Sequence, residues 1–116
     1  MTDPANCEVV GRWRITGSDM WDQDYLDLAK PAHFTLDDAG QGEIAFGAAH
    51  LDLHVEYGRQ IVFFRFAGFA EGDELWGDGT AEIADDGTLE IEIYFVDGDE
   101  PTLTAQRETS SADRKS

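Results

Sequence analysis

The stretch LDLHVEY at residues 51–57 shows the cleanest hydrophobic alternation in the chain. Leu51, Leu53, Val55 and Tyr57 share one parity, and polar residues stand between them. A period of two is typical of a β-strand with one buried side and one side facing solvent. We therefore predict a half-buried strand here, and the same pattern predicts the other strands.

Similar alternation recurs along the chain. The predicted strands cover residues 8–16, 33–36, 43–46, 51–57, 59–69, 75–84, 89–95 and 102–108. Turn sequences such as DDAG at 37–40 and DDG at 85–87 join them as hairpins. Because closing such a meander hides both of its edges, we predict an all-β fold, a small antiparallel up-and-down barrel of about eight strands.

One segment, residues 17–31, breaks the alternation. Ser18 or Asp19 would suit a helix N-cap, and Pro31 would end the helix. The apolar residues spaced i, i+4 and i+7 between them are Trp21, Tyr25 and Leu28. We predict a short amphipathic helix between the first two strands.

Length and composition predict a single domain. The chain has 116 residues, of which 1–108 form the expected barrel and 109–116 a polar, disordered C-terminal tail. No apolar run reaches the roughly 18 residues of a membrane-spanning helix. The first residues carry neither the basic nor the apolar part of a secretory signal, so we expect a soluble, cytoplasmic protein.

The charge balance excludes several partners. Asp and Glu number 25 against 8 Lys and Arg, for a net charge of -17 at pH 7. Binding to nucleic acid requires clustered basic residues, and an anionic membrane would repel this surface. The acidity fits a solubilising surface, a high-salt cytosol or a basic partner protein, and composition leaves all three open.

The sequence contains no recognisable catalytic or cofactor motif. Cys7 is the only cysteine, which excludes an internal disulfide and a multi-cysteine zinc site. It precedes the first strand, where we expect a mobile chain and no catalytic thiol. Phosphate loops, nucleophile elbows and zinc motifs are absent, so we predict no catalytic residues and no cofactor.

Acidic and histidine residues do not form a predicted metal site. Counting an EF-hand from Asp22 places Asp27 and His33 where glycine and glutamate are needed. His50 and His54 share one strand face but lie roughly 13 Å apart at about 3.3 Å per residue. We interpret these side chains as surface residues.

Gly11, Trp13 and Arg107 form a pattern that spans the two ends of the chain. Trp13 lies on the inward parity of the first strand, in a Gly-x-Trp triplet, and Arg107 lies on the inward parity of the last strand. This pattern resembles the calycin superfamily of lipocalins, fatty-acid-binding proteins and avidins. The resemblance implies that the arginine covers the indole at one barrel end. It also implies that the barrel either holds a small apolar ligand or has an interior filled by its own side chains.

Three further segments resemble a family of small uncharacterised bacterial proteins. They are WDQDYLDL at 21–28, GEIAFG at 42–47 and DGTL at 86–89. The likeness covers most of the chain and implies a shared fold without an assigned activity.

For function, we expect a non-enzymatic module that binds a small apolar ligand or a protein. The aromatic residues expected at the barrel mouth are Trp21, Tyr25, Phe69 and Trp76. Ile61 and Phe63 lie opposite the core parity of their strand and predict a homodimer interface. The alternative is an enzyme of unrecognised type that uses carboxylates and a histidine at the mouth, with His33, Glu71 and Asp73 as candidates.

Overall fold

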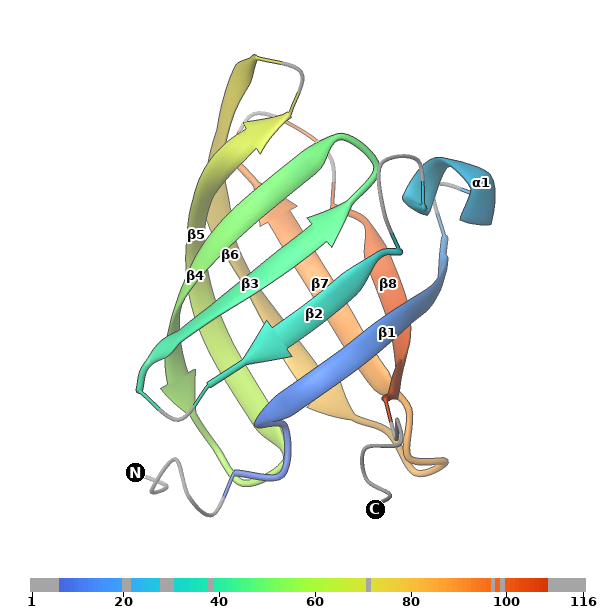
Figure 1. The fold of residues 1–116 in the computed structure, drawn as a ribbon. Coiled ribbons are helices and arrows are strands. Elements are labelled where there is room, and N and C mark those ends of the chain that lie inside the picture. Colours follow the sequence, from blue (N-terminus) through green and yellow to red (C-terminus); the bar gives the residue numbers. More distant parts are fainter. Residues whose placement is uncertain are drawn as a thin grey trace.

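The computed structural model describes residues 7–19, 22–27, 31–37, 39–70, 72–96, 98 and 100–108. Its strands form one closed antiparallel barrel in chain order, with β1 paired to β8 (Figure 1). One short helix, α1, lies between β1 and β2. The predicted fold class is confirmed.

The strands differ in length, from four to eleven residues. Their bounds are β1 Gly11–Ser18, β2 His33–Leu36, β3 Gln41–Phe46, β4 Ala49–Tyr57, β5 Ile61–Ala70, β6 Asp73–Ile83, β7 Leu89–Phe95 and β8 Thr102–Arg107. The helix α1 covers Gln23–Leu26. The long β5–β6 hairpin rises above the rest of the barrel in Figure 1.

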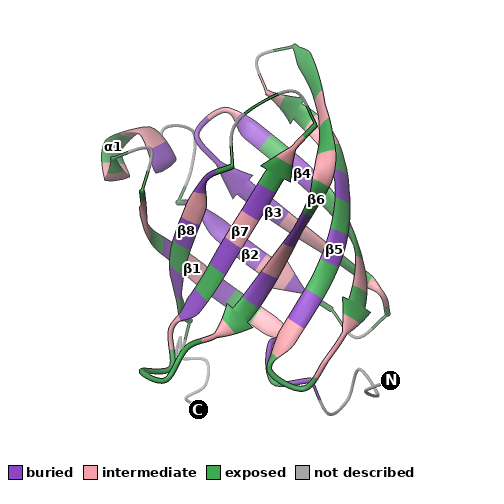
Figure 2. Cartoon of the chain, turned by 180° about the vertical axis from the view of Figure 1, so that it is seen from behind, coloured by how far each residue is buried: buried purple, intermediate pink, exposed green. Residues whose placement is uncertain are grey.

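Alternating side chains fill the barrel interior. Along β4 and β5, buried residues alternate with more exposed ones (Figure 2). Four phenyl rings form a chain through the core: Phe34 and Phe64 have ring centroids 6.3 Å apart, Phe64 and Phe66 6.4 Å, and Phe66 and Phe95 5.3 Å. Tilted and edge-on contacts of this kind stabilise an aromatic core beyond the area that they bury.

Two glycines of β6 make room for these rings. A Cβ at Gly79 would lie 2.6 Å from Cζ of Phe64, and one at Gly77 would lie 3.0 Å from Cζ of Phe66. Both would also meet the backbone of β7, at 2.3 Å and 2.0 Å from carbonyl oxygens. The small inward residues of this strand are therefore required by the packing of the core.

One end of the barrel is closed by Trp13. The indole is 1% exposed, its Nε1 donates a hydrogen bond to the carbonyl of Val9 at 2.9 Å, and the guanidinium carbon of Arg107 lies 4.3 Å from the ring centre. Arg107 also donates to the carbonyls of Glu8 and Val10. The stack predicted from the parities of the two strands is present.

The N-terminal segment differs from its prediction. Cys7 is 6% exposed and belongs to the hydrophobic core, although we expected a mobile chain there. The reason is the hydrogen bonding of the following residues: Arg107 binds two of their carbonyls, and the amide of Glu8 donates to the carbonyl of Arg59 at 2.8 Å. These contacts fold the segment across the closed end.

The helix α1 also differs from its prediction, in its length and in its N-cap residue. It is four residues long and is capped by Asp22, whose carboxylate accepts a hydrogen bond from the amide of Tyr25 at 3.0 Å. The predicted caps are wrong because β1 continues to Ser18, which pairs with β8, and Asp19 accepts a hydrogen bond from the amide of Thr102 instead. The buried residue of α1 is Leu26, whereas the predicted face residues Trp21 and Leu28 lie outside the described residues.

The two ends of the barrel differ in the elements that they carry. The N-terminus of β1 and the C-terminus of β8 meet at the end closed by Trp13. The opposite end, which we call the mouth, carries α1 and the β3–β4, β5–β6 and β7–β8 connections (Figure 1). Within the described ranges, no helix has the length and apolar character that a membrane crossing requires. The tail at 109–116 lies outside the described residues.

Candidate functional site

The mouth of the barrel contains a pocket of about 370 Å³. Its wall is mostly apolar and partly aromatic, and it is open to solvent on one side. The lining residues are Tyr25, Phe46, Ala49, Ala70, Glu74, Leu75, Trp76, Phe95, Val96 and Gly98. We call this the mouth pocket. It combines a concave apolar wall with few polar groups, as small-molecule sites generally do.

Strand ends from three hairpins build the wall. Phe46 and Ala49 face each other across the two-residue β3–β4 turn, and Ala70 and Leu75 flank the β5–β6 connection. Phe95 ends β7 and also packs against Phe66, edge on, at 5.3 Å. This contact places the mouth pocket directly above the filled interior.

The helix α1 covers one side of the mouth, and Gly47 in the β3–β4 turn allows its close approach. Gly47 has a φ of +54°, and a Cβ there would lie 2.5 Å from the Tyr25 ring. Its amide donates to the carbonyl of Leu26 at 2.7 Å. Glycine meets both requirements, because it adopts a positive φ without steric cost and adds no side chain.

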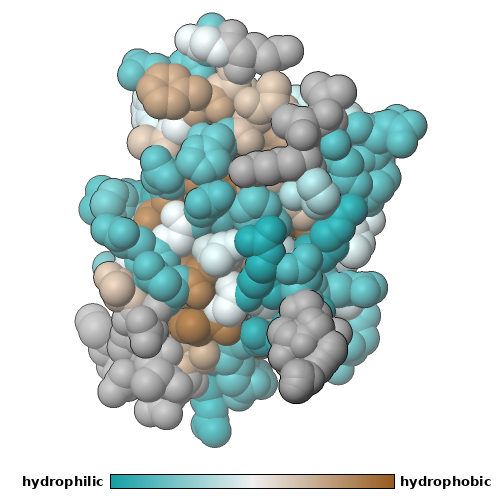
Figure 3. All heavy atoms as spheres, in the orientation of Figure 1, coloured by the Kyte–Doolittle hydropathy of each residue, from teal (hydrophilic) through white to brown (hydrophobic). Residues whose placement is uncertain are grey.

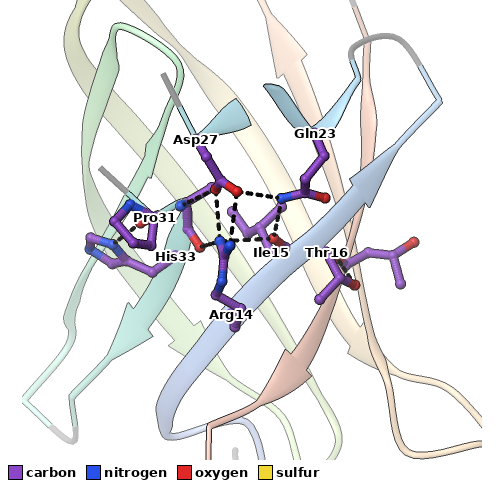
Figure 4. Close-up of polar contacts among 9 residues, drawn as sticks. Arg14, Ile15, Thr16, Gln23, Asp27, Pro31 and His33 are labelled. Atoms are coloured by element: carbon purple, nitrogen blue, oxygen red, sulfur yellow. Dashed lines mark hydrogen bonds and ion pairs between the residues drawn. The ribbon is translucent and has the colours of Figure 1, made fainter. Parts of the chain in front are cut away.

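An ion pair anchors this helix to the barrel wall (Figure 4). Arg14 on β1 binds both carboxylate oxygens of Asp27 at 2.8 Å, and the same carboxylate accepts from the amide of Ala32 at 2.8 Å and from Gln23 at 3.0 Å. The Arg14 guanidinium also donates to the carbonyls of Ile15 and Ala32. Two-pronged binding of this kind fixes orientation as well as distance.

These contacts change the acidity of both partners. The hydrogen bonds from Arg14, Ala32 and Gln23 hold the pKa of the Asp27 carboxyl well below its usual range. The same hydrogen bond to Asp27 raises the pKa of Arg14. The anchor is therefore a structural ion pair that holds Leu26 in the core and Tyr25 at the mouth pocket.

A second polar cluster lies on the outer wall beside the mouth. Nε2 of His33 lies 3.0 Å from Oε2 of Glu43, and Nε2 of His50 lies 3.4 Å from the same oxygen. His33 is buried, and its Nδ1 lies 3.3 Å from the carbonyl oxygen of Pro31. The hydrogen bond from His33 is the main cause that lowers the pKa of Glu43.

Strand register brings these residues together. Ala45 pairs with His33 on one side and with His50 on the other, so both rings share the outer face of neighbouring strands with Glu43. We interpret His50 as a surface residue and name His33 only as a candidate for the enzyme alternative, so this grouping is not among our predictions. The signal was the two-residue turn at Gly47 and Ala48, which sets His50 opposite Ala45.

The predicted mouth residues fall in different places. Tyr25 and Trp76 line the mouth pocket. Phe69 is 58% exposed and is not part of the lining, and Trp21 lies outside the described residues. Sequence reasoning missed the apolar strand-end residues that form most of the wall, which are Phe46, Ala49, Ala70, Leu75, Phe95 and Val96.

The described candidates of the enzyme alternative, His33 and Asp73, do not converge in the pocket. His33 lies on the outer wall against Glu43, and the exposed Asp73 is not part of the pocket lining. Glu71 lies outside the described residues. Among the described His, Cys, Asp and Glu side chains, no group of three or more is arranged to hold a metal ion.

The outer wall of the barrel carries a separate apolar surface. Phe63 on β5 is 51% exposed and Tyr94 on β7 is 36% exposed, whereas Ile61 is partly buried. Phe69, Trp76 and Val96 are also at least half exposed and lie toward the mouth. In Figure 3, apolar atoms appear near the upper end of the molecule among hydrophilic ones.

The fold and the mouth pocket together define a closed antiparallel β-barrel with one plugged end and one pocket-bearing end. In comparisons with known proteins, no protein-family model matches the chain, and no curated protein matches it.

Proposed function

We propose that this protein is a non-enzymatic binding module that holds a small apolar ligand in the mouth pocket. The observation that carries the proposal is the pocket itself, about 370 Å³ in volume and walled mainly by aliphatic and aromatic side chains. Ligand sites in proteins typically occupy roughly 300 to 1,000 Å³ with such a lining. Burial of an apolar ligand there would remove apolar surface of both partners from water.

The filled interior supports a site at the mouth over one deep inside the barrel. Phe64 and Phe66 occupy the core below the pocket, at 3% and 4% exposure. A ligand would therefore rest on Phe95 and Leu75 at the strand ends. Its size would be limited by the pocket and by α1.

A calycin-like origin of the barrel is part of the proposal. The contact between Trp13 and Arg107, with Gly11 beside it, supports this relationship. A Cβ at Gly11 would lie 2.7 Å from Nη1 of Arg107, so the glycine of the triplet leaves space for the arginine. In a calycin-like barrel the ligand would enter at the end opposite the tryptophan, which here is the mouth.

Titration with the neutral fluorophore N-phenyl-1-naphthylamine tests the proposal. We expect saturable enhancement of its emission with one site per chain, and loss of that site in Ala70→Trp, whose indole would fill the pocket. Ala39→Trp, at an exposed position beyond the opposite end of the barrel, is the matched control and should bind like the unmodified protein. Equal binding by both variants, with unchanged melting temperatures, would refute the mouth pocket as the site.

A second proposal concerns a partner protein. We propose that the outer face around Phe63 contacts a second copy of the chain, because this ring is 51% exposed and Tyr94 adds apolar surface nearby. Exposed apolar patches commonly mark interfaces, and contacts between identical chains are usually symmetric and dimeric.

A further inference from the structure

The charge of the ligand can be inferred from the residues around the mouth pocket. Among the residues that the structure describes, Glu74 is the only acidic one in the lining, and none of the lining residues is a lysine, arginine or histidine. Glu74 is exposed at the rim, and within the described ranges no ion pair involves it. An anionic ligand such as a fatty acid would thus meet a carboxylate and no basic side chain.

Further carboxylates surround the rim. The helix, strand ends and connections at this end carry exposed acidic residues, which are Asp19, Asp22, Asp24, Asp73 and Glu100. Charges of one sign around a concave apolar site focus the field and raise the local concentration of oppositely charged ligands.

No described arginine or lysine is part of the pocket lining. Arg12, Arg59 and Arg107 are near the plugged end, Arg65 is within β5, and Arg14 is paired with Asp27. Lys30 lies outside the described residues. Three of the described arginines therefore lie near the plugged end and none lines the mouth pocket. The carboxylates at the mouth favour positively charged ligands.

Aromatic rings in the pocket wall also favour a positively charged ligand. Tyr25, Phe46, Trp76 and Phe95 all contribute to the lining. The face of an aromatic ring attracts a cation, and tryptophan does so most strongly. Aromatic walls with a nearby carboxylate suit a quaternary or protonated amine that also carries an apolar group.

We propose that the ligand of the mouth pocket is an organic amine with an apolar body. This inference rests on the proposed function and specifies the chemistry of the same site. The ammonium group lies at the rim near Glu74 and Trp76, and the apolar body packs against Leu75 and Phe95. Neutral apolar molecules bind more weakly, and carboxylates of the same length bind most weakly.

Three ligands with one alkyl chain test the inference at low ionic strength: octyltrimethylammonium, octan-1-ol and octanoate. Each competes with N-phenyl-1-naphthylamine for the protein. We expect the ammonium to bind roughly three- to tenfold more tightly than the alcohol, which corresponds to a single cation–π or ion contact at a partly exposed site. Octanoate should bind more weakly than the alcohol, and salt should reduce both differences.

Two controls separate the pocket from general attraction to an acidic protein. Tetramethylammonium, which lacks the apolar body, should not displace the fluorophore. Glu74→Gln should lower the preference for ammonium over alcohol, whereas Glu82→Gln, at the far end of the same strand, should leave it unchanged.

The outcomes distinguish the two proposals. If none of the three octyl compounds displaces the fluorophore, the proposed function fails. If the alcohol or octanoate binds as tightly as the ammonium, or if Glu74→Gln leaves the preference intact, the amine inference is wrong and the pocket remains an apolar site. If the ammonium compound binds more tightly than the alcohol and this preference depends on Glu74, both the proposed function and the amine inference are supported.

Discussion

The guanidinium carbon of Arg107 lies 4.3 Å from the centre of the Trp13 ring, so the last strand closes the barrel over the first. The same guanidinium donates to the carbonyls of Glu8 and Val10 and holds the N-terminal segment over the plug. One side chain of the last strand therefore holds both the first strand and the segment that precedes it.

Replacing Arg107 should destabilise the barrel. Arg107→Ala removes the stacking contact and leaves two carbonyls without their donor, and we expect a loss of roughly 1 to 3 kcal/mol in the free energy of unfolding. The control is Arg12→Ala on the neighbouring strand, which removes an exposed ion pair with Glu108 and an exposed hydrogen bond to Oγ1 of Thr35. Urea unfolding of both variants measures the difference, and equal losses would contradict a special role for Arg107.

The β6 glycines should resist substitution. Gly79→Ala places a Cβ against Phe64 and the β7 backbone, and overpacking of this kind costs roughly 1 to 3 kcal/mol. Gly17→Ala is the matched control, because nothing lies within 4 Å of a Cβ at that strand position. Chemical denaturation compares the two variants. A Gly79→Ala barrel as stable as the Gly17→Ala barrel would show that the wall is less tightly packed than described.

The ion pair between Arg14 and Asp27 should make α1 sensitive to acid. The folded state lowers the pKa of Asp27, so its stabilising contribution is complete above the usual value of 3.8 and is lost as pH falls through the lower folded value. We expect Asp27→Asn to lower the melting temperature at neutral pH and the difference to shrink in strong acid. Asp24→Asn, on the exposed side of the helix, is the control. A difference that does not change with pH would contradict this account.

Salt should stabilise the protein. With a net charge of -17, the folded barrel gathers many like charges, and screening relieves their repulsion. Thermal melts from low salt to about 1 M, where the Debye length is about 3 Å, test this. A rising melting temperature fits adaptation to a high-salt environment, and a flat or falling one contradicts it.

Self-association should depend on Phe63. Light scattering at micromolar concentration should show a dimer for the unmodified chain and a monomer for Phe63→Glu, because the charged side chain would be buried in the interface. The control Arg65→Glu changes charge within the same strand without removing apolar surface. A monomer in the unmodified protein would refute the interface.

The sequence predicted the elements that depend on parity alone. The alternation at residues 51–57 identified β4, and the inward parity of Trp13 and Arg107 placed them together because the two edges of a meander meet when it closes. The short helix was expected in the right segment, but its cap was misplaced because continued pairing of β1 with β8 could not be read from helix signals.

The residues that line the mouth pocket could not be predicted from local sequence patterns. Phe46, Ala49 and Leu75 converge because of the stagger of the strands around the barrel, and the register shift between Ile15 and Gly17 is part of that stagger. The grouping of His33 with His50 could have been predicted from two hairpin registers, because His33 and His50 both pair with Ala45.

The most direct test of the mouth pocket as a binding site is amide chemical-shift mapping of the isotope-labelled protein during titration with octan-1-ol. We predict saturable shifts confined to the strand ends at the mouth, with Ala49, Ala70 and Leu75 among them, and unchanged signals around Trp13 at the plugged end. Shifts centred on the Phe63 face, or no shifts up to the solubility limit of the alcohol, would contradict the proposal.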